Sequence, residues 1–377
     1  MRTIFAWAAL AIAACLAAEA GPITVLTSGM SVPEDISLAP ASFGSFGGQY
    51  FVDDTGVGAA GPSVIWAVQP SGLATVFDNT AFSSSLTRGS TFLPATWGSV
   101  GGQFVVAATN VTGCTTGQMC TGSTGTSLVA LDANGNPTTL FSTPNTAGMI
   151  SSLGAPVVAP AGYGAFGGDL LAIHLPTFNQ TSTGATVIAV SPAGTSGTVA
   201  TLPTGDFTVG SVFAPTGFGT LGGMLLVSDA ASGDIYSVDA LGNVTLFTTV
   251  PIGQGQTGLR QMAFAPAGYG SYGGDLFVSV SGSPAGGGVG GSVDVVDGSE
   301  NVIAVLMQGT VGAPFDPRGL YFASSTDLLV NDADPGILIA TPDAFTPTAA
   351  PEPATLAMLF GGLALLGLRQ IKRRRRR

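Results

Sequence analysis

The stretch Ala265-Pro266-Ala267-Gly268-Tyr269-Gly270-Ser271-Tyr272-Gly273-Gly274-Asp275-Leu276-Phe277-Val278 contains the phrase that decides the fold of this chain. An Ala-Pro pair is followed by six intervening residues, a Gly-Gly pair and a short apolar run. The phrase recurs, and the residue after the glycine pair, or in its place in the shortened last copy, lies at 49, 103, 169, 224, 275 and 327. A phrase repeated every 51 to 66 residues is typical of a repeat architecture.

Each repeat contains four short apolar runs separated by turn residues. In the fourth repeat the third run is Ile235–Val238 and the fourth is Val244–Phe247, with Asp239-Ala240-Leu241-Gly242 between them. Runs that are rich in β-branched residues and bounded by Gly, Pro, Asn and Asp are typical of strands and hairpins. Four antiparallel strands in about 50 residues form a blade of a β-propeller. The sequence therefore predicts an all-β, six-bladed propeller of four-stranded blades.

The two ends of the repeat region predict how the ring closes. The sixth repeat has a third strand, Ile337–Ala340, but no fourth apolar run follows it. At the other end, Ile23–Thr27 precedes the first repeat and matches the fourth-strand phrase Val244–Thr248. We therefore expect the N-terminal strand to complete the last blade, which removes an exposed sheet edge.

The chain outside the repeats carries targeting segments. Arg2, an apolar run and Ala18-Glu19-Ala20 are typical of a secretory signal peptide over residues 1–20. An alternative is a lipoprotein signal, because Ile12–Cys15 resembles a lipobox with Cys15 as the acylated residue. The predicted division is a signal peptide at 1–20, a propeller at 21–345, a linker at 346–353, a transmembrane helix at 354–368 and a basic cytoplasmic tail at 369–377.

The C-terminus has a tripartite order. Pro351-Glu352-Pro353 precedes an apolar segment, which is short for a membrane span, and a cluster of arginines follows it. An ordinary tail anchor is one interpretation. The order also resembles the PEP-CTERM sorting signal. That resemblance implies recognition and removal by an exosortase in the inner membrane of a Gram-negative bacterium. The protein would then reach the cell surface or the extracellular matrix, often in biofilm-forming species that secrete exopolysaccharide.

Charge and cysteine usage in the body agree with export. Of the 22 acidic residues only Glu19 and Glu352 lie outside the body, whereas its only basic residues are Arg88, Arg260 and Arg318. Such a body lacks the positive surface that nucleic-acid binding needs, so this class of partner is excluded. Cys114 and Cys120 predict a loop disulfide in an oxidising compartment, with a redox or metal pair as the alternative.

All three arginines of the body, its one histidine and four of its acidic residues lie at two positions of the repeat. The first position, six residues before the proline of Ala-Pro, holds Glu34, Arg88, Gly154, Val209, Arg260 and Arg318. The second, five residues after the residue that follows Gly-Gly, holds Asp54, Ala108, His174, Asp229, Val280 and Asp332. The start of the first strand and the end of the second lie on one face of a propeller. Both positions are therefore predicted at one mouth of the central channel.

Three interpretations of these residues remain open. The guanidiniums of Arg88, Arg260 and Arg318 could bind an anionic group such as a sugar carboxylate or sulfate. The acids, with His174, could instead hold a hard cation such as Ca²⁺. The structural alternative is three ion pairs that join or brace blades, with the partners Asp54–Arg88, Asp229–Arg260 and Arg318–Asp332.

Catalytic motifs give little support for an enzyme. The one histidine is not accompanied by a nucleophile elbow, and no phosphate-binding loop or dinucleotide fingerprint is present. The repeat resembles NHL-type and gluconolactonase-type propellers, and the latter resemblance implies a divalent metal with Glu34 as a ligand. The expected function is an exported binding or scaffold module, with exopolysaccharide as a candidate partner and no assigned cofactor. The alternatives are a metal-dependent gluconolactonase-like hydrolase and a tail-anchored structural protein.

Overall fold

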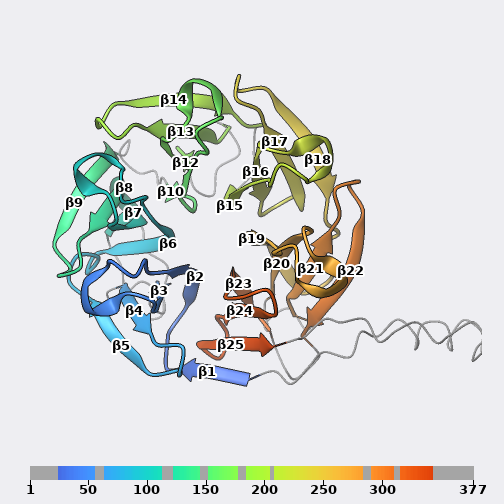
Figure 1. Cartoon of the computed structure of the whole chain (residues 1–377), viewed down its shortest axis with the longest axis horizontal. Coiled ribbons are helices and arrows are strands. Elements are labelled where there is room, and N and C mark those ends of the chain that lie inside the picture. The colour runs from blue at the N-terminus through green and yellow to red at the C-terminus, as the bar shows by residue number, and fades with distance from the viewer. Residues whose placement is uncertain are drawn as a thin grey trace, which may run out of the picture.

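The computed structural model describes residues 24–55, 63–112, 122–144, 152–176, 184–203, 208–282, 290–309 and 315–342. These residues form six antiparallel sheets arranged in a ring, so the predicted six-bladed, all-β propeller is confirmed (Figure 1). Blades 1 to 5 take their strands in chain order from the centre outward, the outer strand of blade 6 comes from the N-terminus, and in every blade the first strand of the repeat lies nearest the axis of the ring.

The strands of the first three blades are as follows. Blade 1 contains β2 (Pro33–Leu38), β3 (Tyr50–Asp54), β4 (Val64–Val68) and β5 (Ala74–Asp78). Blade 2 contains β6 (Ser85–Phe92), β7 (Phe104–Thr112), β8 (Gly122–Leu131) and β9 (Pro137–Pro144). Blade 3 contains β12 (Leu170–Leu175), β13 (Thr186–Val190) and β14 (Ser196–Thr201), with its first strand split into β10 (Ser152–Leu153) and β11 (Val157–Val158).

The other three blades repeat the pattern. Blade 4 contains β15 (Thr208–Phe213), β16 (Leu225–Asp229), β17 (Asp234–Val238) and β18 (Val244–Thr249). Blade 5 contains β19 (Gln256–Phe264), β20 (Leu276–Gly282), β21 (Ser292–Val296) and β22 (Val302–Gln308). Blade 6 contains β23 (Pro317–Phe322), β24 (Asp327–Asp332), β25 (Ile337–Pro342) and, as its outer strand, β1 (Thr24–Ser28).

The ring closes as the sequence predicts. Strand β1 pairs antiparallel with β25, so that Thr24 lies opposite Ala340 and Ser28 lies opposite Ile337. The N-terminal strand therefore completes the blade that the C-terminal repeat begins, and the two ends of the body hold each other in place.

The repeated Ala-Pro and Gly-Gly phrase forms the turn between the first and second strands. In blade 1 the Gly48 N–H donates to the Ala39 carbonyl at 3.0 Å, and a 3₁₀ turn at Gly44–Phe46 lies between them. A side chain at Gly47 would lie 2.5 Å from the carbonyl oxygen of Ala41, and Gly48 has a φ of +79°. The first glycine therefore permits close backbone approach and the second permits a left-handed conformation.

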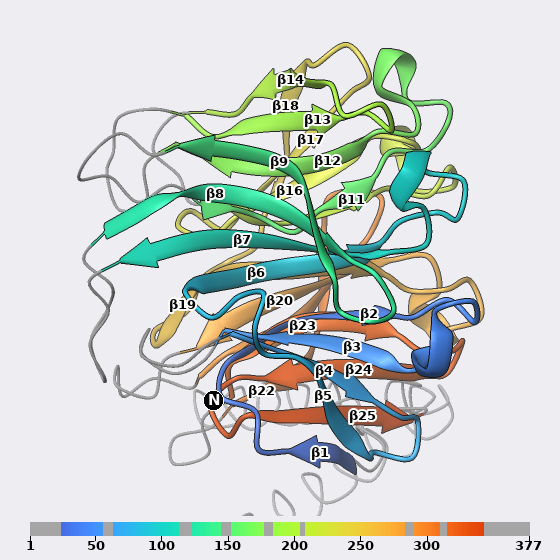
Figure 2. The ribbon, with the colours of Figure 1, turned by 90° about the vertical axis from the view of Figure 1, so that its left-hand side faces the viewer.

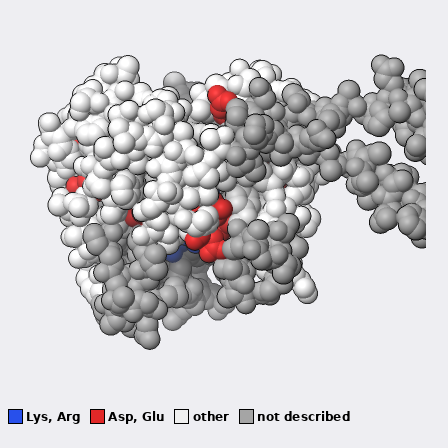
Figure 3. Space-filling model, turned by 90° about the horizontal axis from the view of Figure 1, so that it is seen from below, with Lys and Arg blue, Asp and Glu red and all other residues white. Residues whose placement is uncertain are grey.

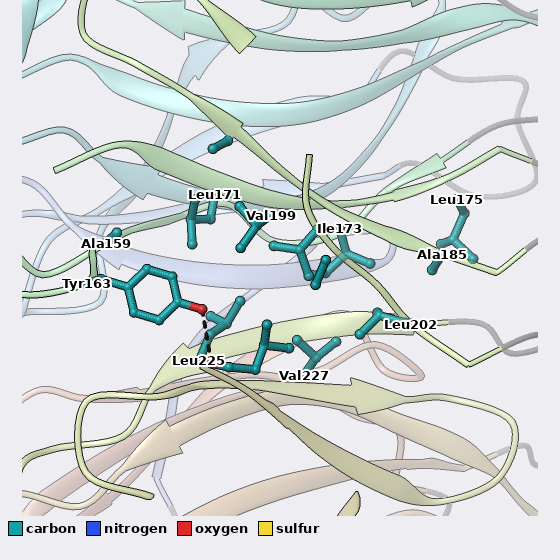
Figure 4. Packing of buried hydrophobic residues seen from close by; sticks show 14 residues of the cluster. Ala159, Tyr163, Leu171, Ile173, Leu175, Ala185, Val199, Leu202, Leu225 and Val227 are labelled. Atoms are coloured by element: carbon teal, nitrogen blue, oxygen red, sulfur yellow. Dashed lines mark hydrogen bonds between the residues drawn. The ribbon is translucent and has the colours of Figure 1, made fainter. Parts of the chain in front are cut away.

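Apolar side chains fill the spaces between neighbouring blades. Figure 4 shows the space between blades 3 and 4, where Leu171 and Ile173 of β12 pack with Leu225 and Val227 of β16. The hydroxyl of Tyr163 closes one end of this cluster by donating to the carbonyls of Val238 and Asp239 at 3.0 and 2.9 Å. Each blade is thus held mainly by the faces it presents to its two neighbours.

Several sequence predictions fall outside the described residues. They are the signal peptide, the Cys114–Cys120 disulfide, the Pro351-Glu352-Pro353 motif with its transmembrane helix, and the basic tail. Within the described ranges, no helix has the length and apolar character that a membrane crossing requires.

Candidate functional site around the ring axis

A bulge recurs in the first strand of the blades at the first polar repeat position. In β2, Pro33 pairs with Asp54 and Asp35 pairs with Asp53, which leaves Glu34 as the extra residue. Corresponding register shifts enclose Arg88 in β6, Arg260 in β19 and Arg318 in β23. A bulge turns the side chain of the extra residue out of the regular alternation of the strand. The bulges therefore set the directions of the side chains of Glu34, Arg88, Arg260 and Arg318, which form most of the site.

The bulges lie at one end of the propeller. In the side view, β7 ends and β8 begins on the left, whereas the 3₁₀ turns of the Gly-Gly phrase lie on the right (Figure 2). Pro33 lies opposite Asp54 and Pro317 lies opposite Asp332, so the first strands begin where the second strands end, and the bulged residues Glu34 and Arg318 are the second residues of their strands. Arg88 lies further along β6, because Thr87 pairs with Ala108 in the middle of β7.

The axial cluster is defined here as Glu34, Arg88, Arg260, Asp316 and Arg318. Arg318 in blade 6 forms an ion pair with Glu34 in blade 1 through its Nη1 atom. The Nε and Nη2 atoms of Arg318 donate to Asp316 Oδ2 at 3.1 and 3.0 Å. The cluster occupies four consecutive blades, 5, 6, 1 and 2, whereas the first repeat position in blades 3 and 4 holds Gly154 and Val209.

The three arginines act electrostatically on the same carboxylate. Burial alone would raise the pKa of Glu34, yet this pKa lies below its ordinary value because the nearby guanidiniums favour the charged form. The contributing residues, in decreasing order, are Arg318, Arg260 and Arg88. Arginines from three blades therefore lie near enough to Glu34 to favour its charged form, and Arg318 contacts it directly.

The surface charge agrees with a single basic site. On the face that Figure 3 shows, the described surface is mostly uncharged, with scattered acidic groups and one small basic area recessed beside some of them. Arg88, Arg260 and Arg318 are the only basic residues in the described ranges, so this area belongs to the axial cluster.

Arg260 differs from Arg318 in its partners. Among the described residues, the Arg260 side chain has no ion pair or hydrogen-bond partner, and its buried Nε atom is left unsatisfied. Burial, together with the neighbouring Arg318, lowers the pKa of Arg260 to about 10, so the side chain remains a cation at neutral pH. The axial cluster thus contains one guanidinium that contributes charge without an internal contact to compensate for its burial.

We expect the variant Arg260→Met to melt at or above the temperature of the unmodified protein. The substitution removes a half-buried cation that has no partner among the described residues and keeps most of the aliphatic volume of the side chain. Thermal unfolding followed by circular dichroism measures the effect. A fall of several degrees would instead show that Arg260 braces the ring, as the structural alternative requires.

The second polar repeat position does not join the axial cluster. Asp54 accepts from the backbone N–H groups of Ser31 and Val32 at 2.8 and 2.6 Å, and Asp229 accepts from that of Ala231 at 2.8 Å. Asp332 accepts from the backbone N–H of Asp316 at 2.9 Å. These aspartates position the backbone of nearby segments.

Two of the three predicted ion pairs are corrected by these contacts. Within the described ranges Arg260 is not paired with Asp229, and Arg318 pairs with Glu34 and Asp316, not with Asp332. The physical reason is the alternation of side chains along a strand. Asp54 lies on the same face of β3 as Val52, which packs against Leu329 and Leu338 of blade 6, so this face points to the preceding blade.

His174 is also separate from the arginines in its interactions. It lies opposite Leu153 and Thr186, and burial lowers the pKa of its imidazole. Its Nε2 atom has no hydrogen-bond partner among the described residues. A neutral imidazole beside buried apolar residues contributes no positive charge to an anion site.

The residues that join the blades were not among the sequence predictions, and they lie one position before the second polar repeat position on the second strands. Side chains at this position bind the backbone of the bulge in the next blade. The contacts are Asp53 Oδ2 with Gly89 N–H at 3.0 Å, Ser228 Oγ with Arg260 O at 2.8 Å, Ser279 Oγ with Arg318 O at 2.7 Å, and Asn331 Nδ2 with Asp35 O at 3.1 Å. The signal was present in the aligned repeats, where four of six residues at this position are polar.

A buried carboxyl pair lies beside the axial cluster. Asp35 and Asp53 face each other across β2 and β3, and they are 7% and 0% exposed. Asp35 accepts from the Ser90 N–H at 2.9 Å, next to the Gly89 N–H that Asp53 accepts. Burial raises the pKa of Asp35 to about 7, and burial with the neighbouring Asp35 and Glu34 raises that of Asp53.

The family comparison identifies the C-terminus. Residues 349–377 match the model of the PEP-CTERM protein-sorting motif. No curated protein matches the chain. The resemblance that the sequence shows in its last residues is therefore confirmed, and the chain carries an exosortase-type sorting signal.

The solved structures that resemble the chain are propellers. A gluconolactonase from Xanthomonas campestris has a TM-score of 0.55 at 17% identity, over 87% of this chain and 92% of that one. A calcium-binding protein, regucalcin, from Agrobacterium tumefaciens has a TM-score of 0.55 at 14% identity, over 87% and 95%. These similarities establish the gluconolactonase-like propeller fold, and the low identities carry no conclusion about activity.

Proposed function

We propose that this PEP-CTERM protein is a non-catalytic binding module that holds an acidic exopolysaccharide at the cell surface or in the extracellular matrix. The sorting motif supports export and envelope sorting. The observation that carries the binding function is the convergence of Arg88, Arg260 and Arg318 on Glu34, in a body that contains no other basic residue. Guanidiniums are well suited to carboxylate and sulfate groups because their N–H donors form a planar fork.

The charges of the axial cluster favour an anionic ligand. Three guanidiniums face the two carboxylates of Glu34 and Asp316, so one positive charge is not balanced within the cluster. The rest of the body is strongly acidic and repels polyanions over longer distances. Binding of an acidic polymer would therefore have to come from this local site.

The hydrolase alternative requires a divalent cation near Glu34, and the residues present do not fit one. Glu34 forms an ion pair with Arg318, and Arg88 and Arg260 would add to the repulsion of a cation. In the described parts of the chain, no group of three His, Cys, Asp or Glu side chains is arranged to hold a metal ion. We therefore derive no metal-dependent step.

Affinity electrophoresis of the full chain, purified in a mild non-ionic detergent, tests the proposal. Gels would contain hyaluronan as a carboxylate polymer, dextran sulfate as a sulfated polymer, or neutral dextran, all with EDTA. We expect retardation by at least one acidic polymer and none by dextran. Equal mobility in all three gels would contradict acidic-glycan binding. A thermal shift on adding millimolar Ca²⁺ would instead favour the cation interpretation.

A further inference from the structure

Blade 6 shows how the axial site binds a carboxylate. Asp316 lies two residues before Arg318, and its Oδ2 atom accepts from both Nε and Nη2 of that guanidinium. The other oxygen, Oδ1, accepts from the Ser281 hydroxyl and from the Gly282 N–H at 3.2 Å. The side edge of Arg318 is therefore occupied by a carboxylate that the chain itself supplies.

Blade 5 has the same arginine without the internal carboxylate. The residue two before Arg260 is Gly258, which lies opposite Ser281 in the strand pairing. Gly258 has a φ of +127°, and a Cβ atom there would lie 1.5 Å from the Ala230 carbonyl oxygen. No side chain at this position could reach Arg260, whose Nε atom has no acceptor among the described residues. The repeat thus supplies a guanidinium in both blades but an internal carboxylate in only one.

We propose that Arg260 is the docking point for the planar carboxylate of an acidic sugar, which binds this guanidinium as Asp316 binds Arg318. The inference rests on the proposed function and assigns its ligand group and its contact residue. A carboxylate whose oxygen accepts from this side of the guanidinium, as Asp316 Oδ2 does from Nε and Nη2 of Arg318, would satisfy the orphan Nε donor and neutralise the unbalanced charge of the cluster. The free energy of burying an unpaired donor is already spent in the folded protein, so the contact strengthens binding.

The neighbouring groups favour a sugar acid over a simple carboxylic acid. Glu34 and Asp316 both lie close enough to act on the charge of Arg260. Glu34 is ionised, because the pKa of this residue is held below its ordinary value by the three arginines, and an ionised carboxylate only accepts hydrogen bonds. A ligand that complements the site therefore combines one carboxylate with hydroxyl donors, which is the chemistry of a uronic acid residue.

Isothermal titration calorimetry of the full chain in detergent tests the assignment, with D-glucuronate, D-glucose and inorganic sulfate as probes. The variants are Arg260→Gln, which removes the charge, and Arg260→Lys, which keeps the charge but removes the planar fork. Asp239→Asn, in an exposed turn between β17 and β18, is the control. We expect Arg260→Gln to weaken glucuronate binding at least about tenfold and Arg260→Lys to weaken it less, because a bidentate charged contact is lost or reduced. Asp239→Asn should bind like the unmodified protein, and glucose should not bind.

The outcomes separate this inference from the proposed function. If glucuronate binds Arg260→Gln and the unmodified protein equally, Arg260 is not the docking residue. If sulfate binds and glucuronate does not, the ligand class is wrong while binding of acidic glycans stands. If hyaluronan still retards Arg260→Gln as strongly as the unmodified chain, the site lies elsewhere and the proposed function survives. If neither the acidic polymers nor glucuronate binds the unmodified chain, both fail. The lysine variant keeps the test valid if the glutamine variant does not fold.

Discussion

Replacing Arg318 with alanine is expected to lower the free energy of unfolding by about 3–5 kcal/mol, because it removes one partner of a buried ionic network. Glu34 and Asp316 are 8% and 7% exposed, and both lose the guanidinium that they share. The pair also joins blade 6 to blade 1, next to the closure of the ring by β1. Chemical denaturation at neutral pH, followed by tryptophan fluorescence, measures the loss.

Two further variants make this result specific. Arg318→Lys keeps a cation but only one point of contact, so its free energy of unfolding should fall by less than that of Arg318→Ala. In Glu34→Gln, the cost of Arg318→Ala should be smaller than in the unmodified protein, since one carboxylate has already been neutralised. A loss below about 1 kcal/mol for Arg318→Ala would mean that the ion pairs contribute no more than exposed ones do.

The comparison between Arg318 and Arg260 separates the two roles that sequence analysis could not separate. Both occupy the same repeat position and the same kind of bulge, so a pattern of residue types treats them as equal. The difference lies two residues earlier, where blade 6 has Asp316 and blade 5 has Gly258. One arginine is therefore structural, and the other is available to a ligand in our proposal.

The fold was predictable because turn residues at fixed positions of the repeat mark where each strand ends. The Gly47-Gly48 pair has a steric reason at both positions, and the same reasons apply in later copies. The last repeat lacks a fourth strand, and one extra strand precedes the first repeat. Pairing this extra strand with the last repeat closes the ring, whereas an open ring would leave an unpaired edge. Both features depend on local sequence and on chain order, which are visible without a structure.

The partners of the charged residues were less predictable because neighbouring residues on a strand face opposite blades. Asp53 faces blade 2, where it accepts from the Gly89 N–H, whereas its neighbour Asp54 lies on the face of β3 that Val52 presents to blade 6. A shift of one residue exchanges the two faces of a strand. The bulges add to this difficulty, because they change the alternation within β2 and β23. Gly89 and Gly319, which follow the bulged residues and lie against the next blade, were the available clue.

A second large effect is expected from the carboxyl pair of Asp35 and Asp53, as a dependence of stability on pH. The folded-state pKa values of both are raised, that of Asp35 to about 7, whereas an unfolded aspartate titrates near 4. Between these values the folded chain holds protons that the unfolded chain has lost, so stability falls as pH rises from about 4 to 7. Asp53→Asn keeps an acceptor for the Gly89 N–H and removes one titrating group. We expect the variant to match the unmodified protein at pH 4 and to be more stable by about 2 kcal/mol at pH 8.

Urea denaturation of both proteins at intervals between pH 4 and 8 measures this difference. Ser228→Ala is the matched control, because Ser228 occupies the same repeat position, binds the next bulge and does not titrate. Its free energy of unfolding should fall by about 1–2 kcal/mol, and by the same amount at every pH, since it removes only neutral hydrogen bonds, with the Gly210 N–H and the Arg260 carbonyl. A gain for Asp53→Asn that is equally large at pH 4 would show that packing, not ionisation, causes it. If the variant matches the unmodified protein at pH 4 but is less stable than it at pH 8, ionised Asp53 stabilises the bulge through the Gly89 N–H. In that case the blade-joining contact, and not the cost of burying a charge, would dominate at this position.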